Sequence, residues 1–234
     1  MGKIAHLIID VQNRYFHPGD LSKTFDDLAH GAPDTLDKHR QHSLYGHQIA
    51  ERINAFAAEC RAQDITNIYV MHRSAPKNAD DEDSLYLVQK GEQEKFIVKS
   101  GFDAFFGASA SLDKTLKDLG IETVIITGGI LGYCIFETAQ SAIHAGYRTI
   151  VAEDMAFPDI FDFAPDARAW KFDEMRDYGI EVMKTHDIAE NLGLRLPSLH
   201  SGQPRSPVKT AGKAADKAAQ PQTTIPVKTQ GKTR

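Results

Sequence analysis

The chain has 234 residues with a formal net charge of −5, and 41% of its residues are hydrophobic and 25% charged. This length and composition suit one substantial globular core. No apolar run is long enough to span a membrane, and two cysteines are too few for a disulfide framework. The first residues lack the basic-then-apolar layout of a signal peptide, so we expect a cytoplasmic protein with no membrane partner.

The charge is distributed unevenly along the chain. Residues 1–196 carry a net charge of −11, and residues 197–234 carry +6. An acidic body argues against nucleic acid as the main partner. Residues 197–234 contain no aromatic residue, so we expect a disordered basic tail after one folded domain over residues 1–196. A contact of this tail with nucleic acid or an acidic partner is the less favoured alternative to a solvated extension.

Short apolar runs alternate with segments of helical periodicity along the domain. In chain order, the expected strands are 4–9, 67–71, 96–99, 123–127, 149–152 and 181–183, and the expected helices are 46–63, 112–119, 133–145, 165–178 and 188–192. Near-continuous apolar strands separated by helices are typical of parallel strands that are covered on both faces. The pattern predicts a three-layer α/β/α, doubly wound fold with a mostly parallel six-stranded sheet, which is a Rossmann-like arrangement.

Three residues with reactive side chains stand at predicted strand ends. Asp10 ends the first strand, Lys99 ends the third and Cys134 follows the fourth. Sites in such sheets lie at the carboxyl ends of the strands, so the topology could bring all three together. Taken singly, each has a simpler explanation: a capping carboxylate, a solvated lysine and a small buried hydrophobe.

A glycine-rich turn, Gly128–Tyr133, precedes Cys134 and places it in the first turn of a helix. Free N–H groups and the positive field there would lower a thiol pKa and could stabilise an oxyanion. Asp10 could then take the thiol proton, and Lys99 could hold Asp10 ionised. Cys60 lies on the apolar face of its helix, so we assign it to the core.

At these positions the sequence resembles the isochorismatase-like cysteine hydrolases, which include nicotinamidases and N-carbamoyl amidohydrolases. The resemblance covers about residues 3–193. Its blocks are Ile9–Asn13, Val98–Phe106 and Thr127–Ile135, followed by Thr138, Ala139 and Ala142. Three ordered blocks are far more specific than any one of them.

The resemblance implies particular roles for residues in these blocks. It implies an Asp10–Lys99–Cys134 catalytic triad, a cis peptide between Gly129 and Ile130, and an oxyanion hole built from the backbone amides of Ile130 and Cys134. It further implies a hydrolase that cleaves a C–N bond of a small amide, ureido or N-carbamoyl substrate through a thioester on Cys134. Family members also suggest a homo-oligomer.

The chain departs from the family pattern in two places. The family usually has Thr-Asp where this chain has Leu131-Gly132. The nicotinamidase branch carries an Asp-x-His pair and a further histidine for a metal, and residues 71–78 contain no such pair. We therefore expect no metal and no other cofactor, and nicotinamide is disfavoured as a substrate. Relatives that cleave the vinyl ether of isochorismate lack the nucleophilic cysteine, so the resemblance together with Cys134 favours amide cleavage over vinyl-ether cleavage.

Two readings compete with an amidohydrolase. A binding or scaffolding module that kept the fold is motivated by Leu131-Gly132 and by the basic tail. A redox-active cysteine protein is a weaker reading, because no resolving cysteine lies near Cys134.

The stretch between Asp20 and Gly46 is polar with weak periodicity and is read as an insertion. Five histidines fall in or next to it: His17, His30, His39, His42 and His47. His39 and His42 have a spacing that fits a metal on a helix, but no second ligand pair supports this. A lid or a subunit contact is favoured instead.

Five residues near the blocks are candidates for substrate binding: Gln12, Phe16, Arg73, Phe102 and Tyr133. Arg73 could bind a substrate carboxylate in a fork, although a surface arginine is the more common case. Phe16 and Phe102, with Tyr15 and Phe105, could wall an apolar pocket, and core packing explains them almost as well.

Overall fold

Six parallel strands form one sheet in the order β3-β2-β1-β4-β5-β6. The computed structural model describes residues 2–16, 33–72, 84–106, 111–159 and 162–195. The strands are β1 (Lys3–Ile9), β2 (Thr66–His72), β3 (Lys95–Lys99), β4 (Ile121–Gly129), β5 (Arg148–Phe157) and β6 (Glu181–Met183). All six predicted strands are present, so the predicted fold class is confirmed, and the described sheet is parallel throughout.

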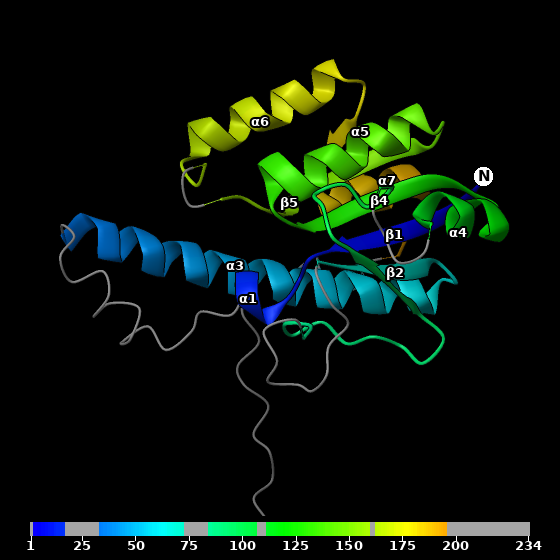
Figure 1. Ribbon diagram of the computed structural model, residues 1–234, viewed down its shortest axis with the longest axis horizontal. Coiled ribbons are helices and arrows are strands. Elements are labelled where there is room, and N and C mark those ends of the chain that lie inside the picture. The colour runs from blue at the N-terminus through cyan, green and yellow to red at the C-terminus, as the bar shows by residue number, and fades with distance from the viewer. Residues whose placement is uncertain (1, 17–32, 73–83, 107–110, 160–161, 196–234) are drawn as a thin grey trace, which may run out of the picture. The chain divides into compact units, whose positions relative to one another are not determined.

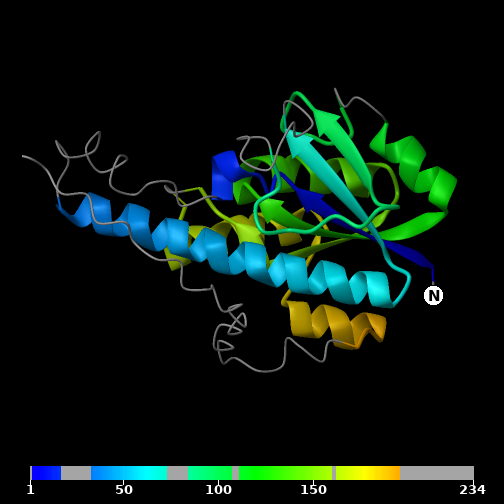
Figure 2. The same ribbon diagram turned by 90° about the horizontal axis from the view of Figure 1, so that it is seen from below.

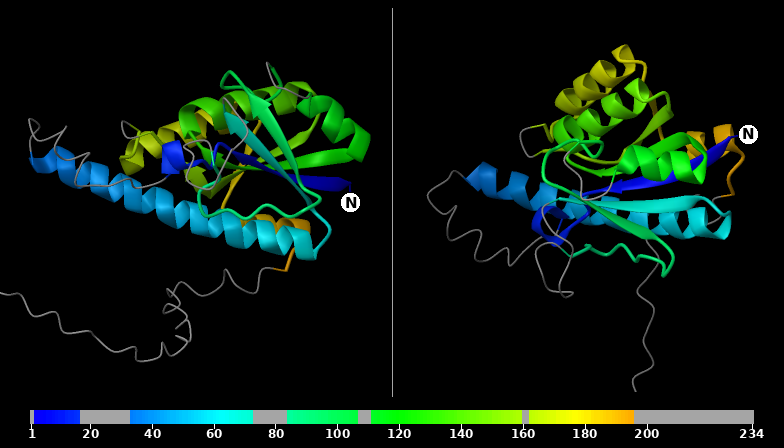
Figure 3. Two further views of the ribbon diagram at one scale, coloured as in Figure 1. Left: turned by 60° about the horizontal axis from the view of Figure 1, so that its bottom comes forward. Right: turned by 45° about the vertical axis from the view of Figure 1, so that its right-hand side comes forward.

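Helices cover both faces of the sheet (Figures 1 and 3). They are α1 (Asn13–Phe16), α3 (Pro33–Ala62), α4 (Leu112–Leu119), the π-helical turn η1 (Leu131–Ile135), α5 (Phe136–His144), α6 (Pro165–Asp177) and α7 (Thr185–Leu192). Figure 2 shows α3 and α7 side by side on one face. The other face carries α4, α5 and α6, which gives the predicted three layers.

Alternation along β1 explains how one strand serves both layers. Ala5, Leu7 and Ile9 belong to the apolar cluster that includes α4, α5 and α6 residues. Ile8 points the other way, into the cluster formed with α3 and α7. Successive side chains of a strand face opposite sides of a sheet, so a strand that is apolar at every position is buried on both.

Helix α3 is longer than its sequence pattern predicted. The expected start was residue 46, but the helix begins at Pro33, a residue suited to a first helical turn. Residues 33–46 of the expected insertion therefore belong to this helix, whereas residues 17–32, with His17 and His30, lie outside the described ranges, as does the side chain of His39. His42 stacks on Phe157 at a centroid distance of 4.5 Å, so this part of α3 packs on the end of β5.

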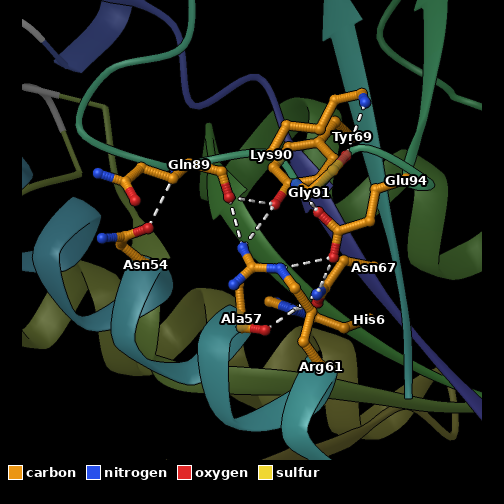
Figure 4. A network of polar contacts seen from close by, with 10 residues as sticks. All are labelled: His6, Asn54, Ala57, Arg61, Asn67, Tyr69, Gln89, Lys90, Gly91 and Glu94. Atoms are coloured by element: carbon orange, nitrogen blue, oxygen red, sulfur yellow. Dashed lines mark hydrogen bonds and ion pairs between the residues drawn. The ribbon is translucent and has the colours of Figure 1, made fainter. Parts of the chain in front are cut away.

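A polar network joins α3, β1, β2 and the segment before β3 (Figure 4). Arg61 bonds Glu94 at 2.9 Å and also donates to the carbonyl of Gln89. Asn67 donates to Glu94 at 2.6 Å and accepts from the His6 ring at 2.8 Å. These bonds hold the segment before β3 against α3 and β2.

None of the helices in the described ranges is both long and apolar enough to cross a membrane. The expected basic tail lies outside those ranges.

Candidate active site

The carboxyl ends of β1 and β4 meet at the centre of the sheet. Strands β2 and β3 lie on one side of β1, and β4 to β6 lie on the other, so the strand order reverses between β1 and β4. Ligands of open α/β sheets bind at such a reversal. Ile9 and Gly128 are register partners there. Gly128 has φ 113°, and a Cβ on it would lie 1.9 Å from the carbonyl oxygen of Ile9. Only glycine fits this position, and the two strand ends approach closely because of it.

The structure brings Asp10, Lys99 and Cys134 together at this end of the sheet. The Lys99 ammonium lies 2.7 Å from Asp10 Oδ2 and 3.3 Å from Cys134 Sγ, and it also donates to the carbonyl of Gly101 at 3.0 Å. The three residues are 1%, 1% and 6% exposed. Asp10 has φ 49°, and its N–H donates to the Val70 carbonyl at 2.8 Å. The side chains predicted from three distant blocks thus share one buried ion-pair cluster.

The pKa of each acidic group in the cluster is raised. Burial raises the pKa of Asp10, and the charge and hydrogen bond of Lys99 oppose that rise. Burial and the Asp10 charge raise the pKa of Cys134 to about 12, against the lowering effect of Lys99. The expectation of a lowered thiol pKa is therefore wrong for the resting site, because loss of hydration and a neighbouring carboxylate outweigh the favourable charge.

One oxygen of Asp10 is available to receive a proton. Oδ2 accepts from Lys99, whereas Oδ1 is buried and has no partner of hydrogen-bond geometry among the described residues. The Cys134 thiol lies near enough to interact with this carboxylate and to lower its pKa. A thiol that lies close to both a lysine and a carboxylate is arranged to pass its proton to the carboxylate when its sulfur attacks.

The turn that carries Cys134 is built differently from the predicted α-helical start. The Gly129–Ile130 peptide is cis, and residues 131–135 form a π-helical turn in which the Ile135 N–H donates to the Ile130 carbonyl at 3.2 Å. Leu131 is fully buried in the apolar cluster. A Cβ added to Gly132 would lie 3.4 Å from side-chain atoms of both Asp162 and Lys171. Leu131 is thus surrounded by apolar side chains, and Gly132 lies next to the side chains of Asp162 and Lys171.

The substrate-binding candidates fall into two groups. Gln12 is buried, and its amide exchanges hydrogen bonds with the backbone of His72. Phe16 is buried against Phe157. Gln12 and Phe16 therefore have structural roles, the first by hydrogen bonding and the second by packing. Phe102 and Tyr133 are about half exposed, and their rings lie 5.5 Å apart next to Lys99 and Cys134 in the chain.

The other aromatic candidates have contacts of a different kind. Phe105 packs against the apolar cluster and Tyr147, whereas Tyr15 hydrogen bonds His72. Arg73 lies outside the described residues. His72 was not among the candidate residues; its place at the end of an inner strand is the signal that could have identified it.

A possible metal-binding group lies on α7. Among the described residues, one group of three ligand-type side chains comes within 4.8 Å: His186, Asp187 and Glu190. All three are exposed, and such groups are common without an ion. Asp10, Lys99 and Cys134 offer a carboxylate, an ammonium and a thiol; a lysine ammonium between the other two is unsuited to cation binding.

Comparisons with known proteins agree with this fold. A search of curated proteins gave no match. An isochorismatase family protein from Desulfovibrio vulgaris has a TM-score of 0.63 and 20% identity, covering 82% of this chain and all of that one. N-carbamoylsarcosine amidase from Thermoplasma acidophilum has a TM-score of 0.53 and 21% identity, covering 78% and 96%.

A cysteine hydrolase from Pseudomonas syringae pv. phaseolicola has a TM-score of 0.60 and 17% identity, covering 82% of this chain and 92% of that one. At these identities the structures establish the shared fold. The model of the isochorismatase domain matches residues 4–187, which includes every element from β1 into α7. The chain therefore belongs to the isochorismatase domain family.

Proposed function

We propose that this protein is a metal-independent cysteine hydrolase that cleaves a C–N bond of a small amide, ureido or N-carbamoyl compound. The observation that carries the proposal is the position of the Lys99 ammonium, 2.7 Å from Asp10 and 3.3 Å from Cys134. A nucleophile, a base and a fixed positive charge are thereby combined in one buried cluster.

The first half-reaction forms a thioester. Asp10 accepts the thiol proton as Cys134 Sγ attacks the substrate carbonyl carbon. The carbonyl oxygen becomes an oxyanion, and the backbone amides of Ile130 and Cys134 are the proposed donors to it. Protonated Asp10 then gives its proton to the leaving nitrogen. The C–N bond breaks, an amine or ammonia leaves, and the acyl group remains on sulfur.

The second half-reaction regenerates the enzyme. Asp10, ionised again, takes a proton from water while the water oxygen attacks the thioester carbon. Collapse of the intermediate breaks the C–S bond, and the thiolate regains the proton from Asp10. The product is a carboxylic acid, or a carbamic acid where the substrate is an N-carbamoyl or ureido compound. Throughout, Lys99 stabilises negative charge on Asp10 or on sulfur.

Family membership and the names of proteins with this fold support the C–N assignment. A nicotinamidase from Staphylococcus aureus and the N-carbamoylsarcosine amidase are both amidases by name. Phe102 and Tyr133, half exposed beside the cluster, are proposed to contact the substrate. Gln12 and Phe16 are proposed to shape the substrate site from the protein interior, since both are buried.

The test is turnover of a panel of N-carbamoyl acids, ureido compounds and small amides, with and without EDTA. Cys134→Ala should abolish turnover, because the thioester cannot form, and mass spectrometry should detect an acyl adduct on the unaltered protein only. Cys60→Ala is the matched control, since Cys60 is a buried core thiol whose pKa burial also raises to about 12.

Two results would reject the proposal. Turnover that survives Cys134→Ala would exclude the nucleophile. Absence of both turnover and adduct across the whole panel would favour the alternative of a binding or scaffolding module. Loss of activity on EDTA treatment that Zn²⁺ or another added cation restores would reject the metal-independent chemistry alone.

A further inference from the structure

His72 ends β2, the strand between the two strands that lead to Asp10 and Lys99. Its register partner across the sheet is Lys99 itself. On the other side, β2 pairs with β1, and the N–H of Asp10 donates to the Val70 carbonyl of β2. His72 therefore stands between the segments that carry the base and the lysine of the proposed triad.

The imidazole of His72 is bonded on both sides. Nδ1 lies 2.6 Å from the hydroxyl of Tyr15, and Nε2 lies 3.3 Å from the carbonyl oxygen of Ser100. A carbonyl oxygen only accepts, so Nε2 carries the hydrogen. In the neutral ring, Nδ1 then accepts the hydrogen of the Tyr15 hydroxyl. The ring thus links α1, which follows Asp10, to the residue that follows Lys99.

The backbone of His72 reinforces this link. Its N–H donates to Gln12 Oε1 at 2.8 Å, and its carbonyl accepts from Gln12 Nε2 at 3.3 Å. Gln12 is fully buried and two residues from Asp10. One residue therefore holds the Asp10 segment by main chain and side chain, and it holds the Lys99 segment by the far edge of its ring.

We propose that His72 is a positioning residue that, with Tyr15, fixes the separation of Asp10 and Lys99 in the catalytic cluster. This inference rests on the proposed function, because the cluster is where the chemistry is placed. A shift of about 1 Å in a catalytic group lowers a rate by about 100-fold, so a fixed bridge between two strand ends has a direct catalytic consequence.

The charge of His72 adds a second effect. In acid, where Nδ1 takes up a proton in place of the Tyr15 hydrogen bond, the positive charge of the ring lowers the pKa of Asp10, against the larger rise caused by burial. The titratable groups that face His72 from the described neighbouring elements are Tyr15, Asp10 and Lys99. Replacement of His72 by a neutral residue should therefore raise the pKa of Asp10 and move the acid limb of activity to higher pH.

The experiment compares four variants on a substrate that the panel identifies. His72→Phe removes both ring bonds and should lower kcat about tenfold or more, with a smaller change in KM. His72→Asn keeps an amide facing Tyr15, and His72→Gln keeps one facing Ser100, so each should retain more kcat than His72→Phe. All three should move the acid limb to higher pH. Tyr15→Phe should lower kcat and leave the limb in place.

Hydrogen exchange provides a readout that needs no substrate. His72→Phe should speed exchange in peptides covering residues 10–16 and 99–106, whereas Tyr15→Phe should affect only the first. His186→Gln, at an exposed position on α7, is the matched control for a lost histidine. If no substrate is found, the proposed function fails while exchange still decides the bridge.

The inference is overturned by either of two findings. With a substrate in hand, unchanged kcat and an unmoved acid limb in both His72→Asn and His72→Gln would exclude a positioning role while the triad stands. Without a substrate, exchange in the two segments that stays at the unaltered level in His72→Phe would exclude the bridge itself.

Discussion

Three residues set the protonation state of the thiol at the centre of the site. Burial and Asp10 raise the pKa of Cys134, and Lys99 lowers it. A sulfhydryl with a pKa of about 12 is protonated at neutral pH, so the resting cysteine is a weak target for alkylation and oxidation. The thiolate then forms only when Asp10 takes the proton, which couples nucleophile formation to substrate attack.

Asp10→Asn separates thiol reactivity from catalysis. Without the carboxylate, the Cys134 pKa should fall below about 12: burial still raises it, but the Asp10 charge that adds to the rise is gone and Lys99 remains 3.3 Å from sulfur. Iodoacetamide labelling against pH, followed by peptide mass spectrometry, measures this pKa. Labelling near neutral pH should become faster while turnover is lost, because no base accepts the proton.

Lys99→Met is the opposite control for the same measurement. It removes the cation that lowers the thiol pKa, so labelling of Cys134 should become slower at any given pH. The Cys60 peptide in the same samples reports a thiol outside the cluster. Labelling of Cys134 in Asp10→Asn that is no faster than in the unaltered protein would refute the assigned effect of the carboxylate.

At the scale of elements, the close approach of β1 and β4 determines where the cluster forms. Ile9 and Gly128 are register partners in the middle of the sheet, one residue before Asp10 and six residues before Cys134. The register of β4 on β5 also shifts between Ile126 and Gly128. The glycine is thus a condition for bringing the nucleophile to the base.

Gly128→Ala should damage both stability and activity. A Cβ at 1.9 Å from the Ile9 carbonyl oxygen, on a backbone with φ 113°, forces the strand ends apart. The combined strain and overpacking should lower the free energy of unfolding by about 3 kcal/mol, as measured by urea titration. Gly179→Ala is the matched control, since it has φ 85° but open space around its Cβ. Equal losses in the two variants would contradict the close-contact argument.

The strands could be predicted because burial on both faces makes them apolar at nearly every position. Asp10, Lys99 and Cys134 could be predicted as neighbours because the carboxyl ends of parallel strands lie at one edge of the sheet. The start of α3 could not be predicted, because residues 33–45 have little apolar periodicity. Helix α1 is a single turn, and the π-helical turn at Cys134 leaves no periodic signal.

The long-range contacts of side chains were also beyond prediction. The bridge through His72 joins residues 57 and 28 positions apart, and the network around Arg61 joins β1, β2, α3 and the segment before β3. Neither leaves a local pattern in the sequence. The raised pKa of Cys134 depends on how completely the folded chain excludes water, which no motif encodes.

For the whole molecule, the centre of the sheet holds a histidine that the fold keeps neutral. His6 on β1 is fully buried between Asn67 and Thr127, at 2.8 Å from each. Asn67 donates its amide hydrogens to Ala57 and Glu94, so its oxygen accepts from His6 Nδ1–H, and Nε2 accepts from the Thr127 hydroxyl. Burial lowers the pKa of His6 from 6.5 to about 4 despite these bonds.

This shift makes global stability depend on pH in a defined window. Above pH 6.5 His6 is neutral in both the folded and the unfolded chain. Between pH 6.5 and about 4 the unfolded chain binds a proton that the folded chain refuses, so stability falls as the pH falls. At about 1.4 kcal/mol per pH unit, the loss from this residue is about 3 kcal/mol.

Urea unfolding between pH 7.5 and 4 measures this loss, and His6→Gln isolates it. The variant should be less stable at neutral pH because its hydrogen bonds are poorer, yet its stability should fall by about 3 kcal/mol less on acidification. Carboxyls such as Glu181, whose pKa Arg148 lowers, also contribute less stability as the pH falls. Their contribution changes equally in both proteins, so it cancels in the difference. His144→Gln, at an exposed position, should run parallel to the unaltered protein. If His6→Gln also runs parallel, the acid sensitivity of the fold arises elsewhere than at the buried histidine in the middle of its sheet.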